Sequence, residues 1–254
     1  MTFPLSFTSI LFFLFSFIFL QAQDAQMTAR EIMERADAKL RGKSSRAEFR
    51  MEIVRPEWSR EIRMDAWSLG SEYSLIVVRE PARERGIGFL KRENELWNWQ
   101  PTIDRVIKMP PSMMLQSWMG SDFTNDDLIR ESSVVDDYEH ELLGREEIEG
   151  RMCHKILLIP ASGSSVVWGK VIAWIDVEEY MQLKGEFYDE DGYLVNTMYG
   201  KSVRELGGKL LPSLLEMVPA DEEGHKTVVE YVQLEFDVDV REDFFSVRTM
   251  KNME

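Results

Sequence analysis

Hydrophobic and polar residues alternate along most of this 254-residue chain. Between residues 46 and 53, every second side chain is apolar and those between are charged, and residues 60–67 repeat the pattern. A period of two is typical of a β-strand with one buried and one solvated face. Similar patterns or short apolar runs predict further strands at 73–78, 87–91, 95–99, 105–109, 138–143, 152–159, 166–175, 183–189, 193–203, 210–218 and 227–237.

One helix is expected before the strands. Thr28 and Glu31 have the spacing of a capping box, apolar residues then recur at helical spacing, and Gly42 ends the pattern. Residues 189–192 predict a tight hairpin turn, because the glycine at the fourth position adopts positive φ without steric cost. A short helix or coil is expected from Asp243 onwards.

These elements predict a mainly β protein. About eleven sequential strands favour a meandering antiparallel sheet, closed or half closed into a barrel. One helix covers only part of the buried face of such a sheet, so another segment must fill its concave side. Residues 109–120 suit that place, because they contain four methionines and Trp118, and because Pro110 and Pro111 keep them out of a sheet.

The methionines of that central segment permit two interpretations. Methionine is flexible and polarizable, so a surface rich in methionine adapts to ligands of variable shape. Alternatively, the segment is a loop that packs its own apolar residues over the end of the barrel.

The N-terminus carries a separate signal. Residues 1–22 contain no charged side chain, and residues 5–20 are almost wholly apolar. This pattern predicts a secretory signal peptide, cleaved after Ala22 or a residue or two later, and hence a mature protein in the periplasm. An uncleaved anchor is the alternative, because the run approaches the ~20 residues needed to span a bilayer. Residues 23–254 are expected to form a single domain.

Charge and cysteine content exclude several classes of protein. The chain has 45 Asp and Glu against 30 Lys and Arg, a net charge of −15. This balance argues against a nucleic-acid partner, since no excess of cations is present to contact phosphates. The one cysteine excludes an intrachain disulfide and any multi-cysteine metal site. We therefore expect no metal and no cofactor.

Candidate catalytic groups are sparse. The three histidines stand far apart in sequence and form no metal-binding motif. The pairs Asp126–Asp127 and Asp136–Asp137 are best interpreted as solvated caps, the first at a helix N-terminus where the dipole favours negative charge. The sequence thus argues against an enzyme and against catalytic residues.

Essentially the whole chain after the N-terminal segment resembles a known family, most specifically from Gly120 to Leu128. Residues 97–101 and 105–107, followed by the run from Gly120 to Leu128, are similar to the outer-membrane lipoprotein-sorting proteins, relatives of the periplasmic lipoprotein carrier LolA. The resemblance implies an unclosed β barrel of about eleven strands, a lid of helices and an apolar cavity for acyl chains. It also implies an association with membrane transporters of the resistance–nodulation–division (RND) type.

The resemblance assigns positions to particular side chains. It implies that seven of them border the apolar cavity from the barrel wall or the lid: Trp97, Trp99, Met113, Met114, Trp118, Met119 and Phe123. The two tryptophans on one strand have the same parity, so they share a face. The family motif itself comprises Gly120, Ser121, Asp122, Phe123, Thr124, Asp127 and Leu128.

Two functions remain open at this stage. The first is a periplasmic carrier or chaperone that holds acyl chains of lipoproteins or lipids for transfer towards the outer membrane. The second is a lipid-sensing or interaction module of the same fold, which docks on a transporter or regulator without carrying cargo. A barrel packed with its own side chains would favour the second function.

Overall fold

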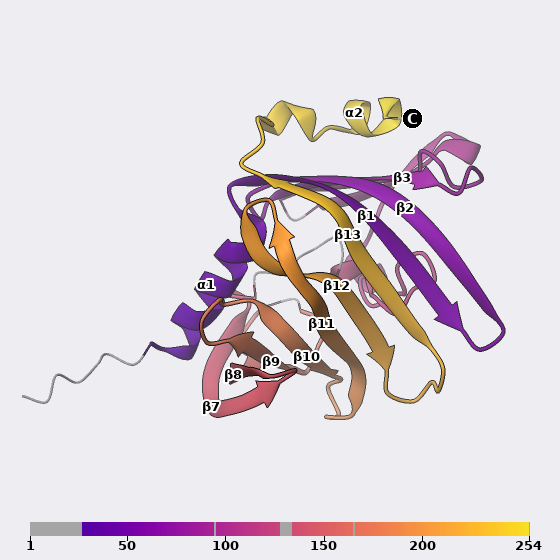
Figure 1. The fold of residues 1–254 in the computed structure, drawn as a ribbon. Helices are drawn as coiled ribbons and strands as arrows, with labels where there is room; N and C mark the ends of the chain where they lie inside the picture. Colours follow the sequence, from indigo (N-terminus) through magenta and orange to yellow (C-terminus); the bar gives the residue numbers. More distant parts are fainter. Residues whose placement is uncertain (1–26, 94, 128–133, 165, 254) are drawn as a thin grey trace, which may run out of the picture.

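Thirteen strands form one antiparallel sheet in a computed structural model that describes residues 27–93, 95–127, 134–164 and 166–253. The order of the strands is β6-β5-β4-β3-β2-β1-β13-β12-β11-β10-β9-β8-β7. The sheet curves into a half barrel that is not closed between its edge strands β6 and β7 (Figure 1). The predicted signal peptide and Leu128 lie outside the described residues.

The strands have the following bounds: β1 Ser44–Arg55, β2 Trp58–Leu69, β3 Tyr73–Glu80, β4 Gly88–Arg92, β5 Glu95–Gln100, β6 Arg105–Lys108, β7 Tyr138–Ile148, β8 Arg151–Pro160, β9 Lys170–Asp176, β10 Gln182–Tyr188, β11 Leu194–Leu206, β12 Lys209–Pro219 and β13 Lys226–Phe236. The described residues also form two α-helices and three 3-10 turns: α1 Ala29–Arg41, α2 Val247–Asn252, η1 Pro101–Ile103, η2 Pro111–Met113 and η4 Glu242–Phe244.

The mainly β, unclosed antiparallel architecture predicted from the sequence is confirmed. The described residues form thirteen strands, one for each segment that the pattern marks, so the overall number of about eleven was too low. Each alternating segment pairs with its neighbours, and even the four-residue strand β6 pairs with β5 along its length. Strand β9 begins at Lys170, four residues later than predicted, because Trp168 turns away from the sheet into the interior. Gly169 permits this turn, since a Cβ atom there would lie 2.2 Å from the Asp189 carbonyl oxygen.

Helix α1 begins as the sequence predicted. The Thr28 side chain accepts a hydrogen bond from the Glu31 amide, and the Glu31 carboxylate accepts one from the Thr28 amide, which completes the capping box. The helix ends at Gly42, whose φ of 65° favours glycine. Its apolar face packs against the concave side of β7 and β9, so α1 covers one end of the half barrel (Figure 1).

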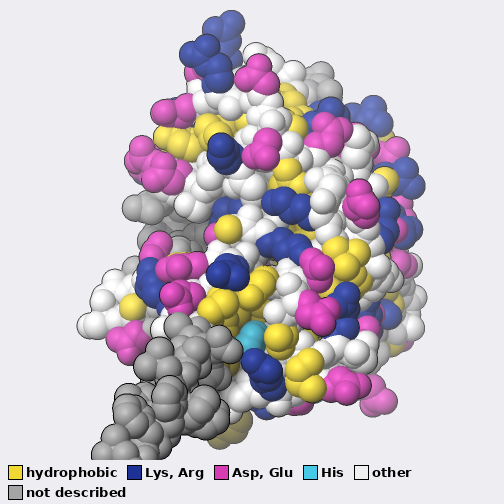
Figure 2. Space-filling view, turned by 60° about the vertical axis from the view of Figure 1, so that its left-hand side comes forward, with side chains coloured by type: hydrophobic (Ala, Val, Ile, Leu, Met, Phe, Trp, Pro, Cys, Tyr) yellow, Lys and Arg dark blue, Asp and Glu magenta, His cyan; other side chains and the backbone are white. Residues whose placement is uncertain are grey.

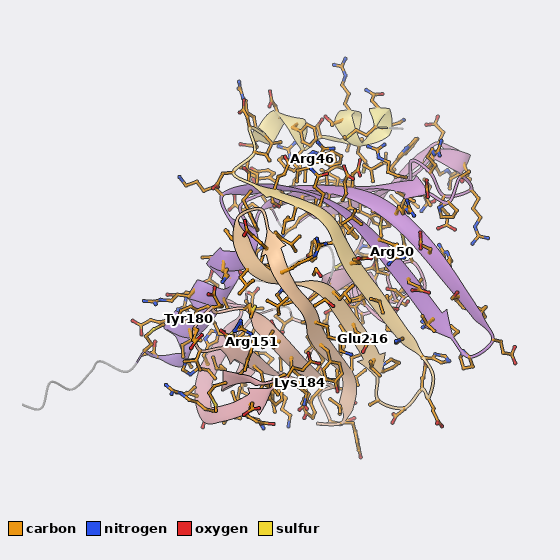
Figure 3. All side chains as sticks on the ribbon, in the orientation of Figure 1. Arg46, Arg50, Arg151, Tyr180, Lys184 and Glu216 are labelled. Atoms are coloured by element: carbon orange, nitrogen blue, oxygen red, sulfur yellow. The ribbon has the colours of Figure 1, made fainter. Side chains whose placement is uncertain are left out.

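The convex face of the sheet is polar over its centre. Arg50 of β1 pairs with Glu230 of β13 at 2.5 Å and with Glu61 of β2 at 3.2 Å. Further along, Glu216 of β12 pairs with Lys201 of β11. Arg50 and Glu216 are labelled in Figure 3. These pairs join neighbouring strands, so the solvated positions of the alternating pattern also match charges across the sheet.

The C-terminal segment covers another part of the convex face. Phe245 and Met250 are buried against the outward side of β3, β4 and β5. Helix α2 approaches so closely that a Cβ atom on Gly88 would lie 2.5 Å from the Met250 side chain. The short C-terminal helix expected from the sequence is thus a docked element of the fold (Figure 1).

Candidate functional site

The segment between the two edge strands enters the concave side of the sheet. We call residues 109–127 the plug segment. It folds back on itself as a hairpin, in which the Trp118 amide donates to the Phe123 carbonyl at 2.8 Å and the Asn125 amide donates to the Gln116 carbonyl at 2.9 Å. Met119 and Gly120 form its tip with φ values of 52° and 81°. Within the described residues, α1 and this hairpin take the place of the expected helical lid, and the prolines and positive-φ tip of the hairpin disfavour a helix there.

A buried ion pair holds the tip of the plug segment. The Asp122 carboxylate accepts two hydrogen bonds from Arg55, at 2.9 and 3.0 Å, and one from the Thr227 hydroxyl at 2.7 Å. The side chains of Arg55 and Asp122 are only 12% and 6% exposed. Arg55 also donates to the Gly120 carbonyl at 3.1 Å. These contacts tie the family motif to the ends of β1 and β13.

The second half of the motif forms another local structure. Thr124 and Asp127 make a capping box, with the Asp127 amide donating to the Thr124 hydroxyl and the Thr124 amide donating to the Asp127 carboxylate. The same carboxylate accepts a hydrogen bond from the Trp168 indole at 3.2 Å. Burial raises the pKa of the Asp127 carboxyl, and these hydrogen bonds oppose the rise.

An apolar cavity of about 350 Å³ lies between α1 and the concave face of the sheet. Its walls come from both halves of the half barrel, with Ala47, Ile76, Leu158, Phe187 and Leu215 among the lining residues. A volume of this size is typical of small-molecule sites. The arrangement can hold an apolar group of a ligand out of water.

The cavity opens beside the C-terminal end of α1. Leu40, which is 44% exposed, and the exposed residues Gly70 and Ser71 of the β2–β3 turn line both the cavity and the surface. On the side of the molecule where α1 lies, hydrophobic side chains reach the surface between Lys and Arg side chains (Figure 2). A ligand can therefore enter here without displacing a strand.

A second hollow of about 510 Å³ lies beside the tip of the plug segment. It is lined by exposed and acidic groups, including Asp189, Glu190 and Leu115. Phe123 and Trp168 line both this hollow and the cavity, so they form a partition between the two spaces. The Trp168 ring packs on Phe187, with centroids 5.2 Å apart.

The structure brings together only part of the predicted cavity set. Met114, Trp118 and Phe123 are buried in one apolar cluster on the concave face, and Met119 packs against that cluster. Phe123 alone of the seven borders the cavity, while Met114 and Trp118 fill the space beneath it. Met113 is half-buried beside them, at the end of η2.

The prediction that Trp97 and Trp99 border the cavity is wrong. The two tryptophans do share a face, as their parity predicted, but they belong to the apolar cluster beneath Phe245 and Met250 on the convex side. The reason is that the C-terminal segment docks on that side and buries it. Alternation alone does not distinguish which of the two faces becomes concave.

The sequence does not indicate the interior position of Trp168 or the place of Asp126 and Asp127 in the cavity wall. The pattern predicts a strand over residues 166–168, whereas Trp168 points into the interior and donates a hydrogen bond to Asp127. Asp127 caps a turn, as the sequence predicts, but it is half-buried instead of solvated, and Asp126 is buried; both line the cavity. A signal was present in the capping-box spacing of Thr124 and Asp127, which marks a helical turn inside a segment rich in apolar residues.

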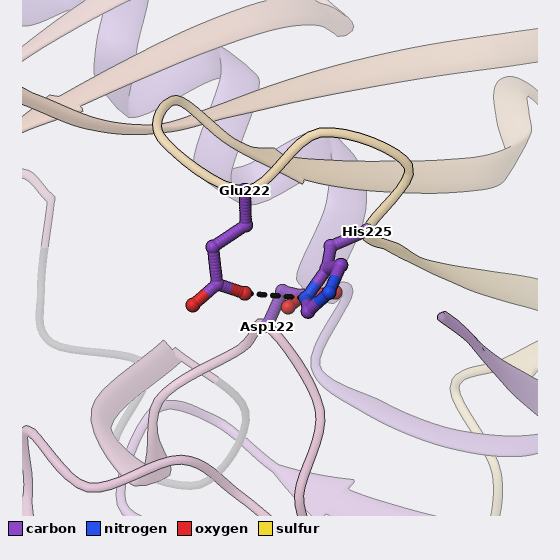
Figure 4. A group of neighbouring side chains, drawn as sticks. All are labelled: Asp122, Glu222 and His225. Carbon is purple, nitrogen blue, oxygen red and sulfur yellow. Dashed lines mark ion pairs between the residues drawn. The ribbon is translucent and has the colours of Figure 1, made fainter. Parts of the chain in front are cut away.

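A group of three possible metal ligands lies near the plug segment. The ligand atoms of Asp122, Glu222 and His225 are within 4.8 Å of one another (Figure 4). The Asp122 carboxylate is already bound by Arg55, however, and His225 pairs with Glu222 at 2.5 Å. A cation here would have to replace the guanidinium of a buried ion pair, so this donor set is better suited to structure than to metal binding.

The histidines lie away from the cavity in the described part of the chain. His140 bonds the Val134 carbonyl at 2.6 Å, and His225 belongs to the group near Asp122. His154 lies within strand β8, where burial lowers its pKa. None of the three lines the cavity wall. No described helix is long and apolar enough to cross a membrane.

Comparisons with known proteins agree with this geometry. A family model described as an uncharacterized protein matches residues 70–252. A search of curated proteins gives no match. Among solved structures, a DUF1329 family protein from Desulfovibrio piger is 22% identical, with a TM-score of 0.80 over 87% of this chain and 97% of the other.

Two further solved structures share the fold. An outer membrane lipoprotein-sorting protein domain from Vibrio parahaemolyticus is 23% identical, with a TM-score of 0.79 over 88% of this chain and 98% of that domain. A LolA superfamily protein from Nitrosomonas europaea is 25% identical, with a TM-score of 0.76 over 87% of this chain and 99% of that protein. All three are matched over almost their whole length.

Proposed function

We propose that this chain is a carrier of acyl chains. It belongs to the family whose model matches residues 70–252, and its fold is similar to those of an outer membrane lipoprotein-sorting protein domain and a LolA superfamily protein. The observation that supports the proposal is the apolar cavity of about 350 Å³ on the concave face of the sheet. The chains belong to lipids or lipoproteins and are transferred towards the outer membrane. No catalytic step is needed.

The energetics of the cavity suit a carrier. Burial of an acyl chain contributes about 0.8 kcal/mol for each CH₂ group, so a chain that fills the cavity is held firmly out of water. Delivery requires the same energy to be returned, and an open half barrel allows this because its wall can change shape at the unjoined edges. The methionines in the plug segment and on β11 and β12 supply adaptable packing around the cavity.

The location that fits this role is the periplasm. Removal of residues 1–22 by signal peptidase is part of the proposal, and it leaves residues 23–254 as one LolA-like domain. All charged residues lie in the part that remains. The proposed donor is an inner-membrane transporter of the RND type, which passes cargo to the carrier through a protein contact.

A second function has one observation in its favour. Met114, Trp118 and Phe123 of the plug segment fill a large part of the concave face with the chain's own side chains. A protein that senses a lipid, or docks on a transporter without transporting cargo, would need no larger cavity than the one that remains. The two functions predict different lipid contents. A carrier holds lipid in a stoichiometric complex that can leave with its cargo, whereas a docking module carries none.

The carrier proposal is tested by filling the cavity. Ala66 lines the cavity wall, so Ala66→Phe should occupy the space of an acyl chain, and Ala220→Phe, at an exposed position, is the matched control. We expect native mass spectrometry to find co-purified lipid on the unmodified protein and on the control, and at least a tenfold loss of affinity for a fluorescent apolar probe in Ala66→Phe. Lipid-free protein with no probe binding would contradict the proposal.

A further inference from the structure

Four polar side chains cross the concave face in a single row. Ser45 of β1 is paired with Ser68 of β2, Ser68 with Ser74 of β3, and Ser74 with Lys91 of β4. All four line the cavity. We call these residues the polar row. Because side chains of directly paired residues point to the same face, the register of four strands builds this row.

The rows that follow on the same face are apolar. Two residues further from the β2–β3 turn, Ala47, Ala66, Ile76 and Phe89 are paired in the same way. Phe49, Met64 and Val78 form the next row. Successive rows are about 7 Å apart. The concave face therefore changes from polar at the mouth to apolar in the interior.

The mouth of the cavity lies next to the polar row. Ser68 and Ser74 flank the β2–β3 turn, whose Gly70 and Ser71 also line the cavity at its exposed end. A ligand that enters beside α1 meets the polar row first. An amphiphile bound with its chain inwards would place its head group at this level.

The chemistry of the polar row favours a head group that accepts hydrogen bonds. Lys91 is only 9% exposed, and its ammonium donates to the Ser71 carbonyl at 2.6 Å. The Ser45 and Ser68 hydroxyl oxygens are 2.7 Å apart. The Ser74 hydroxyl is shielded from solvent and has no hydrogen-bond partner in the described protein. A buried hydroxyl without a partner is costly, and a ligand oxygen would relieve that cost.

Charge along the cavity gives the ligand a direction. Lys91 lies at the mouth, where Asp37 and Arg41 neutralise each other in an ion pair of 2.7 Å. Asp126 and Asp127 line the opposite, closed end near Phe123. A negative head group is thus attracted to the mouth and repelled from the interior.

We propose that the polar row binds the negatively charged head group of a single-chain amphiphile, a carboxylate or a phosphate, while the acyl chain lies on the apolar rows. The proposal rests on the carrier function above and defines its cargo more closely. Ser74 donates a hydrogen bond to a head-group oxygen, and Lys91 supplies the positive charge. Neutral amphiphiles of the same chain length bind through the chain alone.

Displacement of the uncharged fluorescent probe N-phenyl-1-naphthylamine tests this assignment. Three competitors with the same chain are compared: dodecanoate, dodecyl phosphate and dodecanol. We expect both anions to bind the unmodified protein at least about tenfold more tightly than the alcohol, as hydrogen bonds to charged groups predict. The anion that binds with the higher affinity identifies the head group as a carboxylate or a phosphate.

Variants of the polar row separate this role from a structural one. Lys91→Met should abolish the preference for anions and leave dodecanol affinity unchanged, whereas Lys91→Arg should retain it. Ser74→Ala, which tests the row without removing a charge, should weaken anion binding by roughly two- to tenfold. Lys108→Met, at a lysine that is 59% exposed on β6, is the matched control and should behave like the unmodified protein.

The outcomes distinguish the two proposals. An unchanged anion preference in Lys91→Met and Ser74→Ala, with intact circular dichroism, would overturn the polar-row assignment and leave the carrier function standing. Failure of the unmodified protein to bind the probe or any competitor would overturn both.

Discussion

Asp122 is the residue on which the position of the plug segment depends most. Its carboxylate joins β1, through Arg55, to β13, through Thr227, from the tip of a hairpin. Because both members of the ion pair are nearly buried, neither can lose its partner to water without cost. Asp122 of the family motif is thus a structural anchor for the concave side.

Removal of one member of this pair should be strongly destabilising. Asp122→Asn leaves the Arg55 guanidinium buried without a counter-charge, which costs about 3–5 kcal/mol of unfolding free energy. Urea denaturation measures the loss. In a double-mutant cycle with Arg55→Met, the double variant should lose much less than the sum of the two single variants; additive losses would show that the pair contributes no coupling.

Asp127 should make stability depend on pH. Burial raises its pKa in the folded protein above the ordinary value of about 3.9. The unfolded chain keeps the ordinary pKa, and the folded protein has the raised one. At a pH between the two values, the folded state binds more protons than the unfolded state. The contribution of Asp127 to stability therefore falls as pH rises through this window.

The asparagine of the Asp127→Asn variant would stay neutral at every pH, so this variant should not show this fall in stability. The unfolding free energy of the unmodified protein minus that of the variant should therefore decrease from about pH 4 to about pH 7. Urea denaturation at both pH values measures the difference. A difference that is constant with pH, or that increases, would show that the Asp127 pKa is not raised.

Among the elements, the loop before β9 decides how long the cavity is. It carries Trp168 out of the sheet and places the ring between the cavity and the second hollow, with Phe123 opposite. The Asp127 carboxylate holds the indole in this position. The partition therefore limits the length of chain that the cavity accepts.

Trp168→Leu should open the partition and favour longer chains. Palmitate should gain affinity relative to dodecanoate, by up to about 0.8 kcal/mol for each additional buried CH₂. Probe displacement by a series of fatty acids measures this gain. Trp174→Leu is the matched control, because Trp174 is equally buried but packs between Lys155 and Lys184 outside the cavity. The same chain-length preference in both variants would argue against a partition.

At the scale of the whole molecule, net charge governs how the protein meets a membrane. The chain carries a net charge of −15, and all of that charge remains after residue 22. Lipid surfaces with negative charge repel such a protein, even though Lys and Arg side chains lie among the acidic ones on the side where α1 lies (Figure 2). Cargo should therefore pass through a protein partner.

Vesicle flotation tests the charge argument directly. Residues 23–254 should not float with phosphatidylglycerol vesicles at low salt, and should float with vesicles of a cationic lipid until salt is added. Binding to phosphatidylglycerol vesicles at low salt would contradict the prediction and would indicate a basic surface strong enough to act alone.

Local pattern was enough to predict the elements of this fold. Alternation of polar and apolar residues identified the strands, because side chains of a strand point to opposite faces at every step. The capping box at Thr28 and the turn at residues 189–192 depend on neighbours within a few residues, and the structure confirms both. The same local rule placed Trp97 and Trp99 together on one face.

Only the tertiary structure decided which face becomes the cavity. Trp97 and Trp99 are on the convex side because the C-terminal segment docks there, and that contact joins residues more than a hundred positions apart. Trp168 and Asp127 meet for a similar reason, across forty-one residues. The polar row needs the register of four strands to place Ser45, Ser68, Ser74 and Lys91 side by side. Such contacts depend on the curvature of the sheet and on what covers each face, which no short stretch of sequence contains.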